Sequence, residues 1–130
     1  MMKNTNDIFF KYASALHDDL MELCPFSQIF PVCMPAGEVL LPYAFMQRES
    51  VEMRMVKNIP EAASMSVSIT ICTETYDEGV EYAQKVFNYL NGYTFDFENV
   101  PLRYTLTNAA ESYDSGAYLQ ILTFNIRINA

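Results

Sequence analysis

Apolar and polar side chains alternate along three stretches of this chain. The clearest is residues 64–73, Ser-Met-Ser-Val-Ser-Ile-Thr-Ile-Cys-Thr, and the alternation recurs over residues 101–107 and 117–129. Successive side chains on a β-strand point to opposite faces of the sheet. The pattern therefore predicts three strands, each with one packed face and one polar face.

Two further strands with weaker patterns are expected earlier in the chain. Residues 28–33 read as a short strand, in which Pro31 indicates an edge position or an irregular strand. The next strand is expected over residues 43–49. Alternation over residues 51–55 indicates that pairing continues there or resumes after a bend, and residues 57–60 are predicted to form a loop.

Two stretches carry the three-and-four spacing of an amphipathic helix. Residues 6–23 and the residues that follow Thr75 place their apolar side chains on one face. Pro25 ends the first helix, because the residue before a proline avoids helical backbone angles. Residues 75–78 (Thr-Tyr-Asp-Glu) form a capping box at the start of the second helix, and Gly92 supplies a left-handed residue at its end.

The last two strands are predicted to pair as a hairpin with a long tip over residues 108–116, which closes on the turn signal Asp-Ser-Gly. The expected order of elements is α-β-β-β-α-β-β, in one domain over residues 1–130. Helices in such an order must cover one face of the sheet. We therefore expect an α+β fold, with a mainly antiparallel sheet and two helices packed on one face.

Composition and charge exclude several functional classes. With 51% hydrophobic and 14% aromatic residues, the chain is not disordered. Its net charge of −8 argues against a nucleic-acid-binding surface, because phosphate contacts need clustered lysine and arginine. No apolar run approaches the roughly 20 residues needed to cross a bilayer, so we expect no membrane association. Since no signal-peptide pattern is present, we expect a protein made in a cytoplasm.

No set of residues suited to catalysis or metal binding stands out. The cysteines, Cys24, Cys33 and Cys72, lack the CxxC spacing of a zinc site. His17 is the single histidine, and the four glycines are too dispersed for a phosphate loop. Residues 96–98 (Asp-Phe-Glu) leave a hydrolase or ligand-binding domain as an alternative. The prediction is a protein with no enzymatic activity, no metal and no cofactor.

Tyrosine and methionine are more frequent than a core of this size requires. The chain has nine tyrosines and eight methionines, and both residue types are enriched at protein interfaces. We therefore expect the exterior of the molecule to carry its function. The tyrosines at predicted cap, polar-face or loop positions are Tyr76, Tyr82, Tyr93, Tyr113 and Tyr118.

Five short strings occur in a recognisable order. They are Ile-Phe-Pro at 29–31, Leu-Pro-Tyr-Ala-Phe at 41–45, Tyr-Asp-Glu-Gly at 76–79, Val-Pro-Leu-Arg at 100–103 and Ser-Tyr-Asp-Ser-Gly at 112–116. In this order the chain resembles the tail-completion, or tail terminator-like, proteins of long-tailed bacteriophages and prophages. The resemblance covers about residues 7–129 and depends on order and spacing. The many methionines and tyrosines depart from the family's pattern.

The resemblance implies a structural protein without catalytic residues. Proteins of this family close the growing end of the tail tube and join the tail to the head connector, typically as rings and commonly as hexamers. It implies three partners, namely further copies of the chain, the tail tube protein and the head–tail connector protein. It also implies a place in the virion tail without sequence-specific nucleic-acid binding. The alternative is a small dimeric α+β binding or regulatory module of the host.

Two segments are expected to contact other subunits or the neck, because exposed loops and strand edges invite partner strands. Residues 49–59 combine charged with apolar side chains, and residues 109–116 form the predicted hairpin tip. The alternative is that both are plain exposed loops. The candidate contact residues are Glu49, Val51, Glu52, Met53, Arg54, Met55 and Lys57 in the first segment, and Glu111, Tyr113 and Asp114 in the second.

Overall fold

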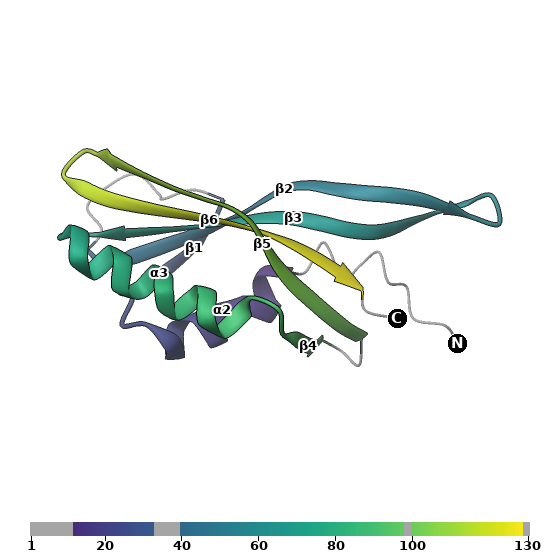
Figure 1. Cartoon of the computed structure of the whole chain (residues 1–130), viewed down its shortest axis with the longest axis horizontal. Coiled ribbons are helices and arrows are strands. Elements are labelled where there is room, and N and C mark those ends of the chain that lie inside the picture. The colour runs from purple at the N-terminus through teal and green to yellow at the C-terminus, as the bar shows by residue number, and fades with distance from the viewer. Residues whose placement is uncertain (1–11, 33–39, 98–99, 129–130) are drawn as a thin grey trace.

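The computed structural model describes residues 12–32, 40–97 and 100–128. In chain order, the elements are α2 (Tyr12–Leu23), β1 (Ile29–Pro31), β2 (Tyr43–Val56), β3 (Ile59–Thr73), α3 (Tyr76–Leu90), β4 (Thr94–Phe97), β5 (Val100–Asp114) and β6 (Ala117–Ile128). The strands form a six-stranded sheet in the order β1-β2-β3-β6-β5-β4, and both helices lie on one face of it (Figure 1). β1 runs parallel to β2, and all other neighbouring strands are antiparallel.

The predicted α+β class, the order of elements and the mainly antiparallel sheet are confirmed. β4 is an addition to the prediction, a four-residue strand that extends the sheet beyond β5. β1 lies at the edge of the sheet, as Pro31 predicts, because an edge strand has a hydrogen-bonded neighbour on one side only and tolerates a residue without an amide hydrogen. Residues 6–11 of the first predicted helix, Cys33 and Glu98 lie outside the described residues.

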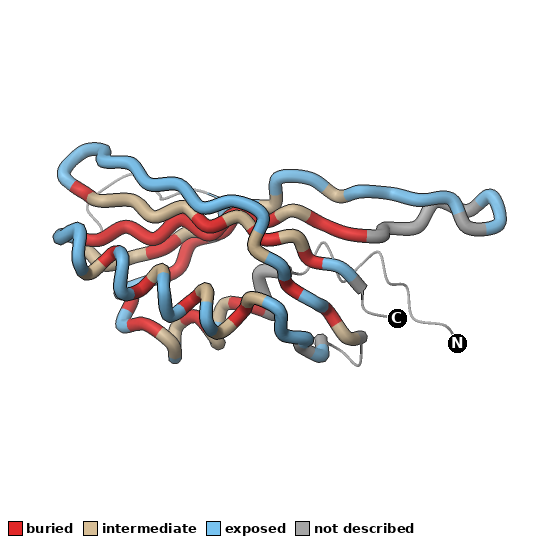
Figure 2. Tube along the Cα trace, viewed as in Figure 1, coloured by how far each residue is buried: buried red, intermediate tan, exposed pale blue. Residues whose placement is uncertain are grey.

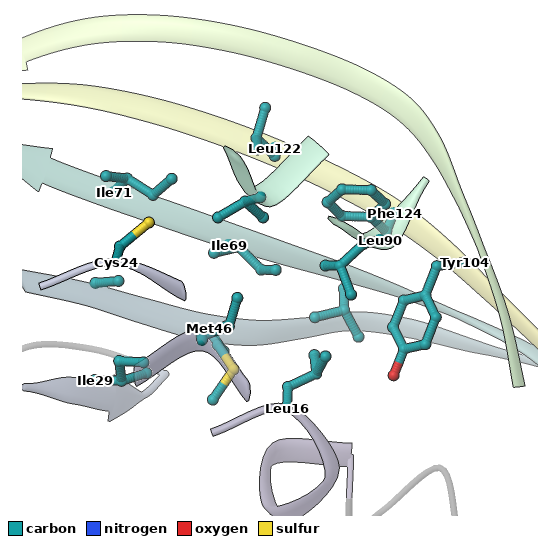
Figure 3. Packing of buried hydrophobic residues seen from close by; sticks show 14 of the residues in the cluster. Leu16, Cys24, Ile29, Met46, Ile69, Ile71, Leu90, Tyr104, Leu122 and Phe124 are labelled. Carbon is teal, nitrogen blue, oxygen red and sulfur yellow. The ribbon is translucent and has the colours of Figure 1, made fainter. Parts of the chain in front are cut away.

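A hydrophobic core fills the space between the sheet and the two helices (Figure 3). Every second residue of β3 from Met65 to Ile71 enters it, as the alternation predicts. Full burial of side chains of this size contributes about 1.5–3 kcal/mol each before entropy is subtracted. The largest fully buried side chains are Phe124, Leu16, Leu20, Met46, Met65, Ile69, Ile71, Leu90, Leu102 and Ile126.

The polar side of β3 is shielded as well, although the helices lie on the other face. Ser68, Thr70 and Cys72 are only 5%, 4% and 2% exposed. These small side chains lie on a central strand between larger neighbours; Thr70, for example, is flanked by Phe45 of β2 and Ile121 of β6. This face of β3 therefore carries small polar side chains as predicted, but most of them are buried and not exposed to solvent.

The β2–β3 connection is a two-residue turn, so the loop predicted over residues 57–60 is wrong. Lys57 has φ 54° and Asn58 has φ 65°, and pairing of the two strands resumes directly after them. Two central residues with positive φ are typical of a type I′ turn, whose twist matches that of the flanking strands. β2 consequently runs unbroken to the turn. Pairing therefore continues over residues 51–55, which is the first of the two predicted alternatives, and the register shifts twice along the way.

The β5–β6 connection is also a two-residue turn, formed by Ser115 (φ 51°) and Gly116 (φ 84°). The turn signal is confirmed, but the long tip predicted before it is wrong. Residues 108–114 are the end of β5 and pair with β6 as far as Asp114 opposite Ala117. Pairing with a neighbouring strand overrides the weak strand preference of this segment.

The Thr75 cap and the left-handed Gly92 anchor the two ends of α3, as the sequence predicts. The Thr75 side chain accepts a hydrogen bond from the Glu78 amide at 3.3 Å. The Glu78 carboxylate, predicted to reach back to the cap, accepts a hydrogen bond from the Tyr82 hydroxyl at 3.4 Å. After the helix, Gly92 has φ 80°, and its amide donates to the Tyr104 carbonyl at 2.8 Å. The helix end is thereby tied to β5.

Candidate interaction surfaces

The β2–β3 hairpin extends beyond the helices as a protruding arm, which we define as residues 49–63 (Figure 1). β3 pairs with β6 only from Ser64 onward, so among the described strands residues 59–62 are paired with β2 alone. Most of the arm's described positions are exposed (Figure 2). The first predicted contact segment, residues 49–59, is therefore mostly the end of β2 and the turn that follows it.

Alternation along the arm separates an apolar face from a charged one. Val51 lies opposite the core residue Met65 in the register, so its face continues the helix-facing row of the sheet. Met53 and Met55 follow on that face and are 50% and 65% exposed. A row of adjacent exposed apolar side chains, unlike a single one, indicates contact with a partner.

The opposite face of the arm carries charge. The Glu52 carboxylate accepts a hydrogen bond from the Ser64 hydroxyl at 3.1 Å, and the backbone of Arg54 lies opposite that of Glu61. Glu49 is exposed within the first register shift, and Lys57 is exposed in the turn at the tip. The arm thus presents methionines on one side and mixed charges on the other.

Aromatic rings gather at the other end of the molecule, between the start of α3 and the β5–β6 turn. The Tyr118 ring meets Tyr113 with 4.9 Å between ring centroids and Tyr76 with 6.0 Å, both nearly edge to face. This geometry is the one that the charge distribution of aromatic rings favours. We call these tyrosines, with Glu111 and Gln120, the tyrosine cluster.

Glu111 is the polar centre of the tyrosine cluster. Its Oε2 accepts hydrogen bonds from the Gln120 amide at 3.0 Å and the Tyr76 hydroxyl at 2.9 Å. These bonds lower the pKa of the Glu111 carboxyl, and the bond to Glu111 raises the pKa of Tyr76. Glu111 therefore stays ionised at neutral pH. A hollow of about 190 Å³ lies against the cluster.

The candidate contact residues form two surfaces and not one site. Glu111 and Tyr113 are brought together in the tyrosine cluster, and Asp114 stands beside the turn, where its carboxylate accepts a hydrogen bond from the Ser115 hydroxyl at 3.3 Å. The residues of the arm lie at the opposite end of the longest axis of the molecule (Figure 1). Within one copy, the two surfaces do not meet.

A third surface, not found from the sequence, lies on the sheet face opposite the helices. Arg103 and Arg127 are direct cross-strand neighbours in β5 and β6. With Thr105, Thr107 and Asn125 they line a hollow of about 390 Å³. Paired guanidinium groups suit a carboxylate or phosphate group. The sequence shows both arginines at polar strand positions, but only the register shows that they are adjacent.

The described side chains offer little for catalysis. Among residues 12–32, 40–97 and 100–128, no three His, Cys, Asp or Glu residues are grouped to hold a metal ion. Cys24 and Cys72 are buried thiols, and burial raises the pKa of Cys24 to about 11, which keeps it protonated. His17 contacts the neighbouring aspartate at 3.1 Å, and Asp96 is exposed on β4.

No helix in the described part of the chain is both long enough and apolar enough to cross a membrane.

The fold is similar to that of a chain in a solved structure described as "Virion of native gene transfer agent (GTA) particle". The TM-score is 0.63 and the sequence identity 17%, and the likeness covers 92% of this chain and 88% of that chain. No protein-family model and no curated protein matches the sequence. At this identity, the likeness shows that the two chains share a fold.

Proposed function

We propose that this protein is a structural, non-enzymatic subunit of a phage-like particle that closes the tail tube as a ring and joins the tail to the head connector. The observation that carries the proposal is the fold, which matches a chain of a virion particle over 92% of this chain. The five strings that resemble tail-completion proteins support the same role. The expected partners are further copies of the chain, the tail tube protein and the connector protein.

The arm gives this role a physical basis. Met53 and Met55 gain nothing from their exposure in an isolated chain. Burying the exposed half of each against a neighbouring subunit would contribute on the order of 1 kcal/mol per residue. The same contribution is made at every interface of a ring, so contacts that are weak individually add up to a stable assembly.

The net charge suits a conduit for DNA. A ring of six copies would carry a formal charge of about −48, from six times −8. Negative charge facing the bore would repel the passing phosphate backbone and keep it from adhering, over a distance of about 10 Å at 0.1 M salt. A surface potential map of the assembled ring tests this part of the proposal, and a neutral or positive bore would contradict it.

Deletion of the gene tests the proposed function directly. We expect electron micrographs of the induced deletion strain to show filled heads and separate tails of irregular length. Purified protein added to such a lysate should restore joined particles. Intact, infectious or DNA-transferring particles in the absence of the gene would refute the proposal. A chain that is a stable dimer at every concentration, in a strain with normal particles, would favour the binding or regulatory module instead.

A further inference from the structure

The tyrosine cluster has unused capacity to bind a cation. Both hydrogen bonds that the described residues make to the Glu111 carboxylate reach Oε2, whereas a carboxylate offers about four acceptor positions. Tyr76 and Tyr113 are 45% and 61% exposed, and the face of an aromatic ring attracts positive charge. The hollow of about 190 Å³ beside them has room for an ammonium group and its last methylenes.

The cluster favours an organic cation over a simple ion. A lysine side chain presents an ammonium group that the carboxylate can accept and methylenes that pack against the tyrosine rings. A small hydrated metal ion gains only the carboxylate. The combination of one fixed carboxylate and several rings is therefore suited to a lysine of a protein partner.

The described residues include such a lysine at the far end of the molecule. Lys57 is exposed at the first position of the turn at the tip of the arm. Lys85, the other lysine in the described ranges, lies on α3 with its Nζ 3.7 Å from Glu81 Oε1. The tip of the arm and the β5–β6 turn mark opposite ends of the longest axis (Figure 1).

Complementary groups at opposite ends of a molecule lead to head-to-tail association. We propose that the tyrosine cluster binds the Lys57 ammonium group of a second copy of this chain, through the Glu111 carboxylate and the rings of Tyr76 and Tyr113. Each copy then donates its arm to one neighbour and receives the arm of another. Such a heterologous contact produces a closed ring when the rotation between copies divides a full turn. The inference rests on the ring that the proposed function requires.

Charge reversal at the two ends tests the contact. The purified full chain is followed by sedimentation velocity from about 1 µM to about 1 mM, the range in which weak association is measurable. We expect the unmodified chain to associate, and Lys57→Glu and Glu111→Lys each to weaken association about tenfold. An equimolar mixture of the two variants should associate again, because every mixed contact then joins either the original pair or the reversed pair.

Matched controls are available on α3. Lys85→Glu and Glu81→Lys make the same charge changes away from both ends and should leave association unchanged. Because Glu111→Lys also removes two hydrogen bonds within the cluster, Glu111→Gln is the milder variant, and urea unfolding confirms that each variant is folded. An unmodified chain that stays monomeric up to about 1 mM, or a mixture that associates no better than either variant alone, overturns the proposal.

Failure of this contact is distinguishable from failure of the proposed function. A Lys57→Glu chain that associates as strongly as the unmodified chain excludes the contact, and if it also restores joined particles to the deletion strain, the tail-joining role remains intact. Intact particles in the deletion strain exclude the role, while the mixing experiment still decides whether Lys57 and the tyrosine cluster meet.

Discussion

Replacing Gly79 with alanine measures how closely α3 approaches the sheet. Gly79 is buried within the helix, and a Cβ at this position would lie 2.8 Å from Thr73 Oγ1 and 3.5 Å from Gln120 Cγ. The Thr73 side chain cannot simply turn away, because it is fully buried and its hydroxyl donates to the Thr75 carbonyl at 2.8 Å. The helix can lie this close to the Thr73 side chain only because residue 79 lacks a side chain of its own.

The magnitudes predict that steric conflict outweighs helix propensity. Alanine in place of a mid-helix glycine favours folding by about 1 kcal/mol. Overpacking of a buried position typically costs about 1–3 kcal/mol, and displacement of the Thr73 hydroxyl loses a hydrogen bond that contributes about 1 kcal/mol. The expected net effect of Gly79→Ala is a loss of about 1–3 kcal/mol in the free energy of unfolding.

Urea unfolding followed by far-UV circular dichroism measures the effect, with equal slopes required for the comparison. Thr73→Ala removes the conflicting oxygen, so in that background Gly79→Ala should be neutral or stabilising, with a coupling of about 1–3 kcal/mol in the double-mutant cycle. Gly92→Ala is the control. Gly92 has φ 80°, and a Cβ added there would have no neighbour within 4 Å, so its substitution should destabilise by backbone strain alone, whether or not Thr73 is changed.

A Gly79→Ala chain as stable as the unmodified protein would refute the reasoning. It would mean that α3 lies farther from β3 than the 2.8 Å contact requires, or that Thr73 moves at little cost. An equal loss in the presence and absence of the Thr73 hydroxyl would also refute it, because the damage would then not come from this contact.

Three further predictions concern charge and ionisation. Arg127→Gln relieves repulsion from the directly opposed Arg103 and should raise the free energy of unfolding by about 0.5 kcal/mol in urea at low salt. The gain should shrink at high salt, and adding Arg103→Gln to Arg127→Gln should give no further stability. The pKa of Glu111 is lowered in the folded chain, so the ionised carboxylate stabilises the fold above the ordinary pKa of 4.5, and this stability is lost as the pH falls through the pKa of the folded chain. The unfolding curves of the unmodified chain and Glu111→Gln should therefore converge in acid. Because burial raises the pKa of Cys24 to about 11, iodoacetamide at neutral pH should label it slowly in the folded chain and readily in urea, as peptide mapping would show; equal rates would contradict its burial.

The sequence predicts the parts of this fold that depend on local periodicity. The alternation around Val67 and Ile69 predicts both the strand and its packed face, because a two-residue repeat is a property of the segment itself. The Thr75 cap and the left-handed Gly92 are equally local. β4 escapes prediction because four residues are too few for a pattern, and its pairing with β5 decides that it is a strand.

The lengths of the two hairpins cannot be read in the same way. Pro60 suggests a loop, yet its backbone pairs with that of Met55 in β2. Among the described strands, β3 has no second partner at this point, so the missing amide hydrogen of proline is tolerated there. Residues 108–114 favour a loop by composition but are held by β6. In both cases a partner strand outweighs local preference, so residues 59–60 and 108–114, which the sequence predicts as loop and hairpin tip, belong to strands.

The interaction surfaces are predicted only in part for a related reason. Glu111 and Tyr113 are expected from the sequence to belong to one contact segment, but their companion Tyr76 lies 35 residues before Glu111 and is joined to it by the Tyr76 hydroxyl. Arg103 and Arg127 are likewise neighbours only through the register of β5 and β6. Spacing along one strand identifies which face a residue occupies, but not what stands beside it on the next strand.

Charge and apolar surface act in opposite directions in this molecule, and the balance suits a subunit that assembles late. A net charge of −8 on each copy opposes association of free chains, most strongly at low salt, where the repulsion reaches farthest. The apolar face of the arm, with Met53 and Met55 about half exposed or more, favours association at any salt concentration. A contact between Lys57 and Glu111 places local attraction at the point where two such chains meet. Free chains must collide in the right orientation to associate, whereas a growing tail would hold neighbouring copies in that orientation. The arm and the tyrosine cluster would therefore bind weakly in dilute solution and more strongly on the growing tail.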